Sequence, residues 1–280
     1  MKSGRLTVAV FALCLGGLFM APFARAARAD WIVTDQASLR LISATDGVKD
    51  LMHAEIGLQV RLKPGWKIYW RNPGDAGIPP QFDWAGSENV KSVRIFWPRP
   101  QAFESFGYTS WGYHDEVVYP IEVTLEKPDV PLHLNLHLFY GICEKVCIPY
   151  EKNLTLDLGA GTGKPTDDAA LIRKYRQEVP TVVGSEASRV KSVQAKLEDK
   201  SRFYVYAKSD VAFAHPGLIV EGEPGVYFSV GKANLSKNGK KAVFDVTAEL
   251  PDPAMSLKGQ KVTVTLLDKD LSAEKRIAIE

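Results

Sequence analysis

Apolar and polar residues alternate along much of the chain, in short runs that turn-forming residues separate. The clearest runs are residues 53–62 (HAEIGLQVRL) and 132–138 (LHLNLHL). A period of two residues puts every second side chain on the same face of a strand, which is typical of a half-buried sheet. Further strands are expected at 66–70, 117–125 and 154–158. Short strands with frequent turn signals predict an antiparallel β-sandwich.

Two stretches hold too many strand breakers for regular strands and are expected to be loops. Residues 71–80 (RNPGDAGIPP) combine proline, glycine, asparagine and aspartate. Residues 103–113 (FESFGYTSWGY) mix five aromatic side chains with glycines. An aromatic loop of this kind can fold over a reactive group, and the alternative is that its rings complete the core.

The pattern changes near residue 160, where the glycine-rich segment 159–163 reads as a hinge. Residues 166–168 are suited to begin a short helix, which Pro180 would end. Strand-like alternation returns from about residue 190. The expected organisation is a signal peptide at 1–29, a first sandwich domain at 30–160, a linker with a short helix at 161–188 and a second β-sandwich domain at 189–280.

The second domain offers little site chemistry. It has no cysteine, and its only histidine is His215. No catalytic constellation can be assembled from these residue types, so support, docking or dimerisation is expected of this domain.

The amino terminus has the three regions of a secretory signal peptide. Lys2 and Arg5 precede an apolar run at 6–20, and small residues follow at 24–29. The run is shorter than the roughly 20 residues that span a bilayer, and no later stretch reaches that length, so no membrane insertion of the mature chain is expected. Cys14 lies within this run after the bulky Leu13, and therefore does not resemble a lipid-anchor site.

Charge excludes two classes of partner. The chain has 35 basic and 33 acidic residues, for a net charge of +2, and loss of residues 1–29 would leave about −2. A nearly neutral chain without a basic run has no electrostatic footprint for nucleic acid or for an anionic membrane surface.

The mature chain would keep two cysteines, Cys143 and Cys147, in the sequence YGICEKVCIP. Export implies an oxidising compartment. A straight strand would separate their α-carbons by about 13 Å, far more than a disulfide allows. If residues 132–142 and 148–158 are the arms of a hairpin with a three-residue loop, the cysteines face each other and a cross-strand disulfide is feasible.

The size of the disulfide loop favours a redox role over a structural one. Closing a loop of about five residues removes only about 2 kcal/mol of unfolded-chain entropy. Short, exposed disulfides are also the easily reduced ones. One alternative is a redox-inert binding module with a structural disulfide.

Metal binding is the other alternative, because two thiolates can hold copper or zinc, and His114, His133 and His137 lie in the same domain. His133 and His137 sit four residues apart on a predicted strand, about 13 Å from each other, and cannot share an ion. Only His137 could complete a cluster with the cysteines. No metal or other cofactor is expected, and a copper-handling or copper-tolerance protein is kept as an alternative.

Several motifs occur in an order that resembles the amino-terminal periplasmic domain of the DsbD family. They are GWKIY at 65–69, Phe106, YHDEVVYPI at 113–121 and the cysteine segment at 140–149. The resemblance covers roughly residues 31–158. The tryptophan-rich stretch at 66–84 is closer to the ScsB branch, whose second sandwich the rest of the chain resembles. The resemblance implies an all-β fold of two immunoglobulin-like antiparallel β-sandwich domains.

The resemblance also implies site roles. It makes the chain a thiol:disulfide oxidoreductase-like electron-transfer module, with Cys147 as the sulfur that attacks first. The implied residues are Cys143 and Cys147 as the catalytic disulfide pair, Phe106 as the aromatic residue of a cap loop that shields them, and Tyr108, Glu104 and Tyr69 as further cap or shielding residues.

The implied partners are thioredoxin-like periplasmic oxidoreductases. Three residues separate the cysteines here, whereas five do in DsbD itself. No transmembrane channel and no C-x-x-C domain follow the second sandwich in this sequence. A separate membrane electron-transfer protein of the CcdA or DsbD type, as used in cytochrome c biogenesis, is therefore expected to supply electrons in the periplasm.

Overall fold

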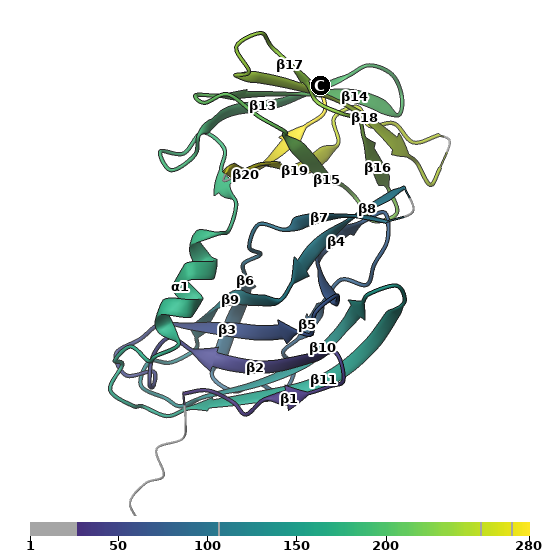
Figure 1. The fold of residues 1–280 in the computed structure, drawn as a ribbon. Coiled ribbons are helices and arrows are strands. Elements are labelled where there is room, and N and C mark those ends of the chain that lie inside the picture. The colour runs from purple at the N-terminus through teal and green to yellow at the C-terminus, as the bar shows by residue number, and fades with distance from the viewer. Residues whose placement is uncertain (1–26, 106, 253, 270) are drawn as a thin grey trace, which may run out of the picture.

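The computed structural model describes residues 27–105, 107–252, 254–269 and 271–280. Two β-sandwiches follow one another along the chain, and helix α1 (Ala169–Gln177) lies between them in sequence (Figure 1). The predicted signal peptide lies outside the described residues except for 27–29. These three residues run antiparallel to β2 (Ala37–Ser43): the Ser43 N–H donates to the Ala27 carbonyl at 2.9 Å, and the Ala29 N–H donates to the Leu41 carbonyl at 2.8 Å.

The first sandwich packs two antiparallel sheets against each other in the described residues. One sheet has the order β1-β2-β3-β9-β6, and the other has the order β11-β10-β4-β8-β7, with β5 beside β10. The strands of the first sheet are β1 (Ile32–Val33), β2, β3 (His53–Leu62), β6 (Val90–Ile95) and β9 (Glu116–Leu125). Those of the second are β4 (Lys67–Gly74), β5 (Gln81–Asp83), β7 (Gln101–Ser105), β8 (Tyr108–His114), β10 (Leu132–Cys143) and β11 (Cys147–Leu158).

The second sandwich follows the same plan. Its sheets have the orders β12-β20-β19-β15 and β13-β14-β18-β16, with β17 beside β18. Its strands are β12 (Thr181–Val182), β13 (Val190–Leu197), β14 (Arg202–Ser209), β15 (Gly217–Glu221), β16 (Tyr227–Val230), β17 (Asn234–Leu235), β18 (Lys241–Glu249), β19 (Lys261–Asp268) and β20 (Leu271–Ala278).

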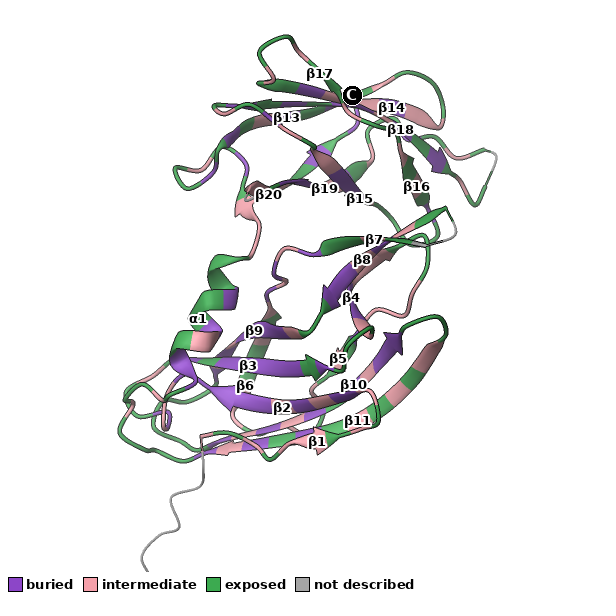
Figure 2. Ribbon diagram, in the orientation of Figure 1, coloured by how far each residue is buried: buried purple, intermediate pink, exposed green. Residues whose placement is uncertain are grey.

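Alternation of side chains produces the core, as the sequence pattern predicts. Leu132, Leu134, Leu136 and Leu138 on β10 are buried, and the residues between them are more exposed. Figure 2 shows buried positions, in purple, along strands of both sandwiches. Buried apolar side chains form one cluster in each sandwich, and the prediction of an all-β sandwich fold is confirmed.

Two predicted loops are wrong in part. The loop was expected from residue 71, but strand β4 continues through Gly74. Its pairing with β8 is irregular between Tyr69 and Gly74, so Pro73 interrupts no regular ladder of hydrogen bonds. Residues 103–113 are not an aromatic loop but most of the β7–β8 hairpin. Gly107, with φ of +83°, supplies the backbone conformation of its turn.

Helix α1 begins at Ala169, within the predicted linker. Its buried residues Ala169, Ile172 and Tyr175 pack against the core of the first sandwich. The Asp168 side chain does not cap the helix. It pairs instead with Arg40 at 3.4 Å. No helix in the described ranges has both the length and the apolar character needed to cross a bilayer.

The two sandwiches are joined by an ionic contact at the end of β4. Arg71 donates from Nε to Glu221 at 3.0 Å and also pairs with Glu274, both in the second sandwich. The Arg71 guanidinium stacks 4.0 Å from the Trp70 ring centroid. Burial opposes its charge, but the hydrogen bonds and charges of the two glutamates outweigh burial and raise the pKa of Arg71. Arg71 therefore connects β4 to two strands of the other domain.

Replacing Arg71 with alanine is expected to destabilise the protein. The change leaves Glu221 and Glu274 close together without a cation, in side chains that are 23% and 32% exposed. We expect a loss of about 2 kcal/mol, less than a fully buried pair would lose. Denaturant unfolding followed by tryptophan fluorescence measures it.

Arg202→Ala is the matched control, because Arg202 pairs with Asp245 inside the second sandwich and is 42% exposed. It should lose clearly less stability than Arg71→Ala, because water screens an exposed ion pair. Equal losses for the two variants would show that the Arg71 contact adds nothing beyond an ordinary surface pair.

Candidate functional site

The β10–β11 hairpin brings the two cysteines together. The strands pair without interruption from Leu132 opposite Leu158 to Cys143 opposite Cys147. The turn has three residues, and the Glu144 N–H donates to the Val146 carbonyl across it at 3.4 Å. Cys143 and Cys147 form a disulfide with α-carbons 4.2 Å apart. The cross-strand arrangement that the spacing made feasible is therefore present.

The two cysteine residues differ in exposure. Cys143 is 2% exposed, whereas Cys147 is half-buried. The turn between them is exposed, and Val146 at its tip is 73% exposed. The sheet order explains the difference: β10 has neighbours on both sides, and β11 is an edge strand. A thiol from another molecule can approach Cys147 more easily than Cys143.

Among the predicted cap residues that the structure describes, Tyr69 contacts the disulfide. Its Oη lies 3.5 Å from Cys147 Sγ. A disulfide sulfur carries no hydrogen, so the hydroxyl is the donor. Burial raises the pKa of Tyr69, which keeps this proton in place. The Tyr69 side chain therefore covers Cys147 and offers it a hydrogen-bond donor.

The segment after β4 holds the Tyr69 ring in position. Gly77 has φ of +140°, and a Cβ at this position would lie 2.4 Å from the ring. Ile78 packs in the same way against Gly141 of β10. Absence of a side chain at Gly77 is therefore required for the close approach to Tyr69.

Two other predicted cap residues, Glu104 and Tyr108, lie in the β7–β8 hairpin. Glu104 accepts a hydrogen bond from Thr109 Oγ1 at 2.9 Å, and Tyr108 is 59% exposed. Asp75 accepts the Thr109 N–H at 2.8 Å, which connects this hairpin to the segment that holds Tyr69. Phe106 lies outside the described residues. Shielding of the cysteines by Phe106, Tyr108 and Glu104 stays a prediction.

Lys67 is a neighbour of the cysteines that the sequence reasoning missed. On β4 it pairs with Cys143 on one side and with His114 of β8 on the other. Paired residues in adjacent antiparallel strands point to the same face. Cys147, Cys143, Lys67 and His114 thus form a row across four strands. Lys67 and Tyr69 are two residues apart, the strand spacing that places both on this face.

The two histidines of β10 that were considered as metal ligands have other hydrogen-bond partners. His133 Nδ1 lies 2.6 Å from Asp157, and His137 Nδ1 lies 2.8 Å from Asn153. His137 is six residues before Cys143 on one strand, so about 20 Å separates them, and the cluster considered for His137 and the cysteines does not form. Within the described ranges, no three His, Cys, Asp or Glu side chains gather in a way that could hold an ion.

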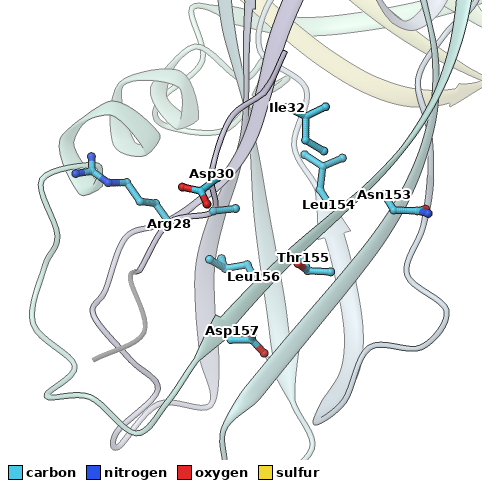
Figure 3. Close-up of a pocket in the computed structure, with 9 residues that line it drawn as sticks. Arg28, Asp30, Ile32, Asn153, Leu154, Thr155, Leu156 and Asp157 are labelled. Atoms are coloured by element: carbon cyan, nitrogen blue, oxygen red, sulfur yellow. The ribbon is translucent and has the colours of Figure 1, made fainter. Parts of the chain in front are cut away.

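A surface groove of about 380 Å³ lies away from the disulfide, along the edge strand β11. Figure 3 shows residues of the amino-terminal segment facing those of β11. Its lining residues are Arg28, Ala29, Asp30 and Ile32 on one side and Asn153, Leu154, Thr155, Leu156 and Asp157 on the other.

Comparison with known families agrees with the geometry of the cysteine hairpin. The family model described as "Thiol:disulfide interchange protein DsbD, N-terminal" matches residues 34–158. The cysteine hairpin therefore lies in a segment that matches the DsbD amino-terminal family. This DsbD-type domain contains the disulfide, Tyr69 and Lys67. A domain family of unknown function, DUF8393, matches residues 178–280.

Solved structures show the fold of the whole chain. The crystal structure of the N-terminal periplasmic domain of ScsB from Proteus mirabilis has a TM-score of 0.72 and 24% identity, and the match covers 91% of this chain and 98% of that one. Both the DsbD-type domain and the second domain are therefore immunoglobulin-like sandwiches. Bovine butyrophilin also matches, with a TM-score of 0.20 and 11% identity over 81% of this chain and 91% of that one. No curated protein matches.

We predict that Gly77→Ala exposes Cys147. The added methyl group would displace the Tyr69 ring, which lies 2.4 Å from the new atom. Reduction of the disulfide by dithiothreitol should therefore become several-fold faster, as followed by thiol titration with time.

The control is Gly259→Ala, at φ of +75° with no atom within 4 Å of the added carbon. Both variants lose roughly 1 kcal/mol from backbone strain, but only the first moves Tyr69. Unchanged reduction kinetics in Gly77→Ala would mean that the ring does not limit access to the sulfur.

Proposed function

We propose that this chain is a periplasmic thiol:disulfide interchange protein that passes electrons through Cys143 and Cys147, to or from thioredoxin-like partners. The observation that carries the proposal is the cross-strand disulfide of a DsbD-type domain, with one buried and one accessible sulfur. The similar ScsB domain is described as periplasmic, which supports the same location for this chain.

The accessible sulfur determines the order of steps in reduction. A thiolate of a reduced partner attacks Cys147 Sγ, the Cys143–Cys147 bond breaks, and Cys143 leaves as a thiolate. The second thiolate of the partner then attacks the partner's own sulfur in the mixed disulfide and releases Cys147. The partner ends as a disulfide and this protein as a dithiol, so two electrons have moved.

The same steps run in reverse towards an oxidised client. The Cys147 thiolate attacks the client disulfide and forms a mixed disulfide, in which one client sulfur becomes a thiolate. The Cys143 thiolate then attacks Cys147 Sγ, which restores the internal disulfide and releases the reduced client. Cys147 is thus the attacking residue and Cys143 the resolving residue.

The surface around the hairpin suits a protein partner. Val146 in the β10–β11 turn and Tyr108 in the β7–β8 hairpin are exposed side chains of one sheet, 73% and 59% accessible. Exposed apolar and aromatic residues are typical contacts in protein interfaces. We assign Phe106, Tyr108 and Glu104 to a cap that opens for the partner. The expected electron donor is a membrane electron-transfer protein of the CcdA or DsbD type.

Single cysteine variants test the order of attack. In Cys143→Ser, Cys147 can attack a client disulfide but the mixed disulfide cannot be resolved, so a covalent complex with an oxidised thioredoxin-like oxidoreductase should accumulate. Cys147→Ser should form little complex, because Cys143 is buried. Non-reducing gel electrophoresis and mass spectrometry measure the complex. Accumulation with Cys147→Ser instead would reverse the roles, and the absence of exchange in the wild-type protein would refute the function.

The reduction potential separates electron transfer from a structural disulfide. Equilibration against glutathione with thiol trapping should give a value between about −150 and −270 mV, among the exchange proteins. A value below about −300 mV would favour the redox-inert alternative.

A further inference from the structure

Lys67 occupies an unusual position for a charged residue. It is half-buried in the middle of the sheet, on β4, and no ion pair joins it to a carboxylate within the described residues. Its ammonium donates to Ser110 Oγ at 3.3 Å and lies 5.0 Å from the Phe103 ring centroid and 5.8 Å from that of Tyr69. Burial lowers the pKa of Lys67. A half-buried cation without an anionic partner needs an explanation.

Opening of the disulfide would produce an anionic partner for Lys67. Cys143 is the direct cross-strand neighbour of Lys67, so their β-carbons are about 5 Å apart. Cys143 is 2% exposed and becomes a thiolate each time the disulfide is opened at Cys147. A buried thiolate is unfavourable unless a positive charge lies close to it. The lysine stem is long and flexible enough to turn its ammonium towards this neighbour.

We propose that Lys67 is the counter-charge of the Cys143 thiolate and thereby makes Cys143 the better leaving group. This inference rests on the proposed function, since it concerns the same disulfide. When a thiolate attacks Cys147 Sγ, the electron pair of the broken S–S bond goes to Cys143, and the ammonium stabilises the new negative charge. A leaving thiol of lower pKa leaves faster, so Lys67 speeds exchange.

Other charges near Lys67 do not take over this role. His114 is its partner on β8, and its Nδ1 is bound to Asp115 at 2.5 Å. Glu104 on β7 is bound to Thr109. Lys145 lies between the cysteines in sequence, but it is exposed in the turn, where water screens its charge. Lys67 is therefore the lysine on the strand next to the buried cysteine, and its ammonium rests on the Ser110 side until a thiolate forms at Cys143.

The test compares the wild-type protein with Lys67→Met, Lys67→Arg and Lys145→Met. Thiolate formation is followed by absorbance at 240 nm against pH in the reduced proteins, and disulfide reduction is followed with dithiothreitol at neutral pH. In Lys67→Met we expect about tenfold less thiolate at neutral pH, the effect of one pKa unit. We also expect reduction to be several-fold slower, because the rate follows the pKa of the leaving thiol only in part. The glutathione equilibrium should shift towards the disulfide in the same variant.

The other two variants are controls. Lys67→Arg keeps the charge and should retain both the thiolate and the rate within about threefold, which a role limited to packing would not explain. Lys145→Met removes an exposed charge and should stay within about twofold. Circular dichroism checks that each variant is folded. If Lys67→Met and Lys145→Met change the two quantities equally, or if neither changes them, the inference is wrong.

These measurements use small thiols and need no protein client. A charge effect of Lys67 in a protein that fails to exchange with any thioredoxin-like oxidoreductase would refute the proposed function and leave this inference standing. Normal exchange without a charge effect would refute this inference and leave the proposed function standing.

Discussion

The register of β10 with its two neighbours is the constraint on which the site depends. Twelve consecutive pairs join β10 to β11, and a one-residue slip of β10 would turn its buried leucines to solvent. At the end of this ladder the same register places Cys143 opposite Cys147 on one side and opposite Lys67 on the other. Burial of the core therefore determines which groups surround the sulfurs.

The order of strands in the sheet produces the chemical asymmetry of the pair. An edge strand carries Cys147, and an inner strand carries Cys143. One sulfur is therefore accessible, and the other is surrounded by protein, where charge is unfavourable unless it is compensated. Tyr69 and Lys67 approach the pair from β4, the tyrosine at the accessible sulfur and the lysine beside the buried one. A single sheet thus holds the disulfide, the tyrosine and the lysine together.

Local sequence patterns predicted the strands and the cysteine hairpin because both depend on neighbouring residues. The errors at 71–80 and 103–113 arose because proline and glycine were read as ends of strands, although an irregular ladder and a tight turn accommodate them. The position of Lys67 could not be predicted, since its pairing with Cys143 joins distant parts of the chain. The same is true of Arg71 and Glu221, which are 150 residues apart in sequence. The two-residue spacing of Lys67 and Tyr69 was the sequence signal that their side chains share one face of the strand.

Strand β4 takes part in two structural units. Its beginning is aligned by the cysteine hairpin, and Arg71, near its end, is held by Glu221 and Glu274 of the second domain. The irregular pairing between Tyr69 and Gly74 separates these two alignments. No regular ladder therefore connects the pairing of Lys67 with β8 to the position of Arg71. The contact with the second domain and the alignment beside the sulfurs are set by separate parts of the same strand.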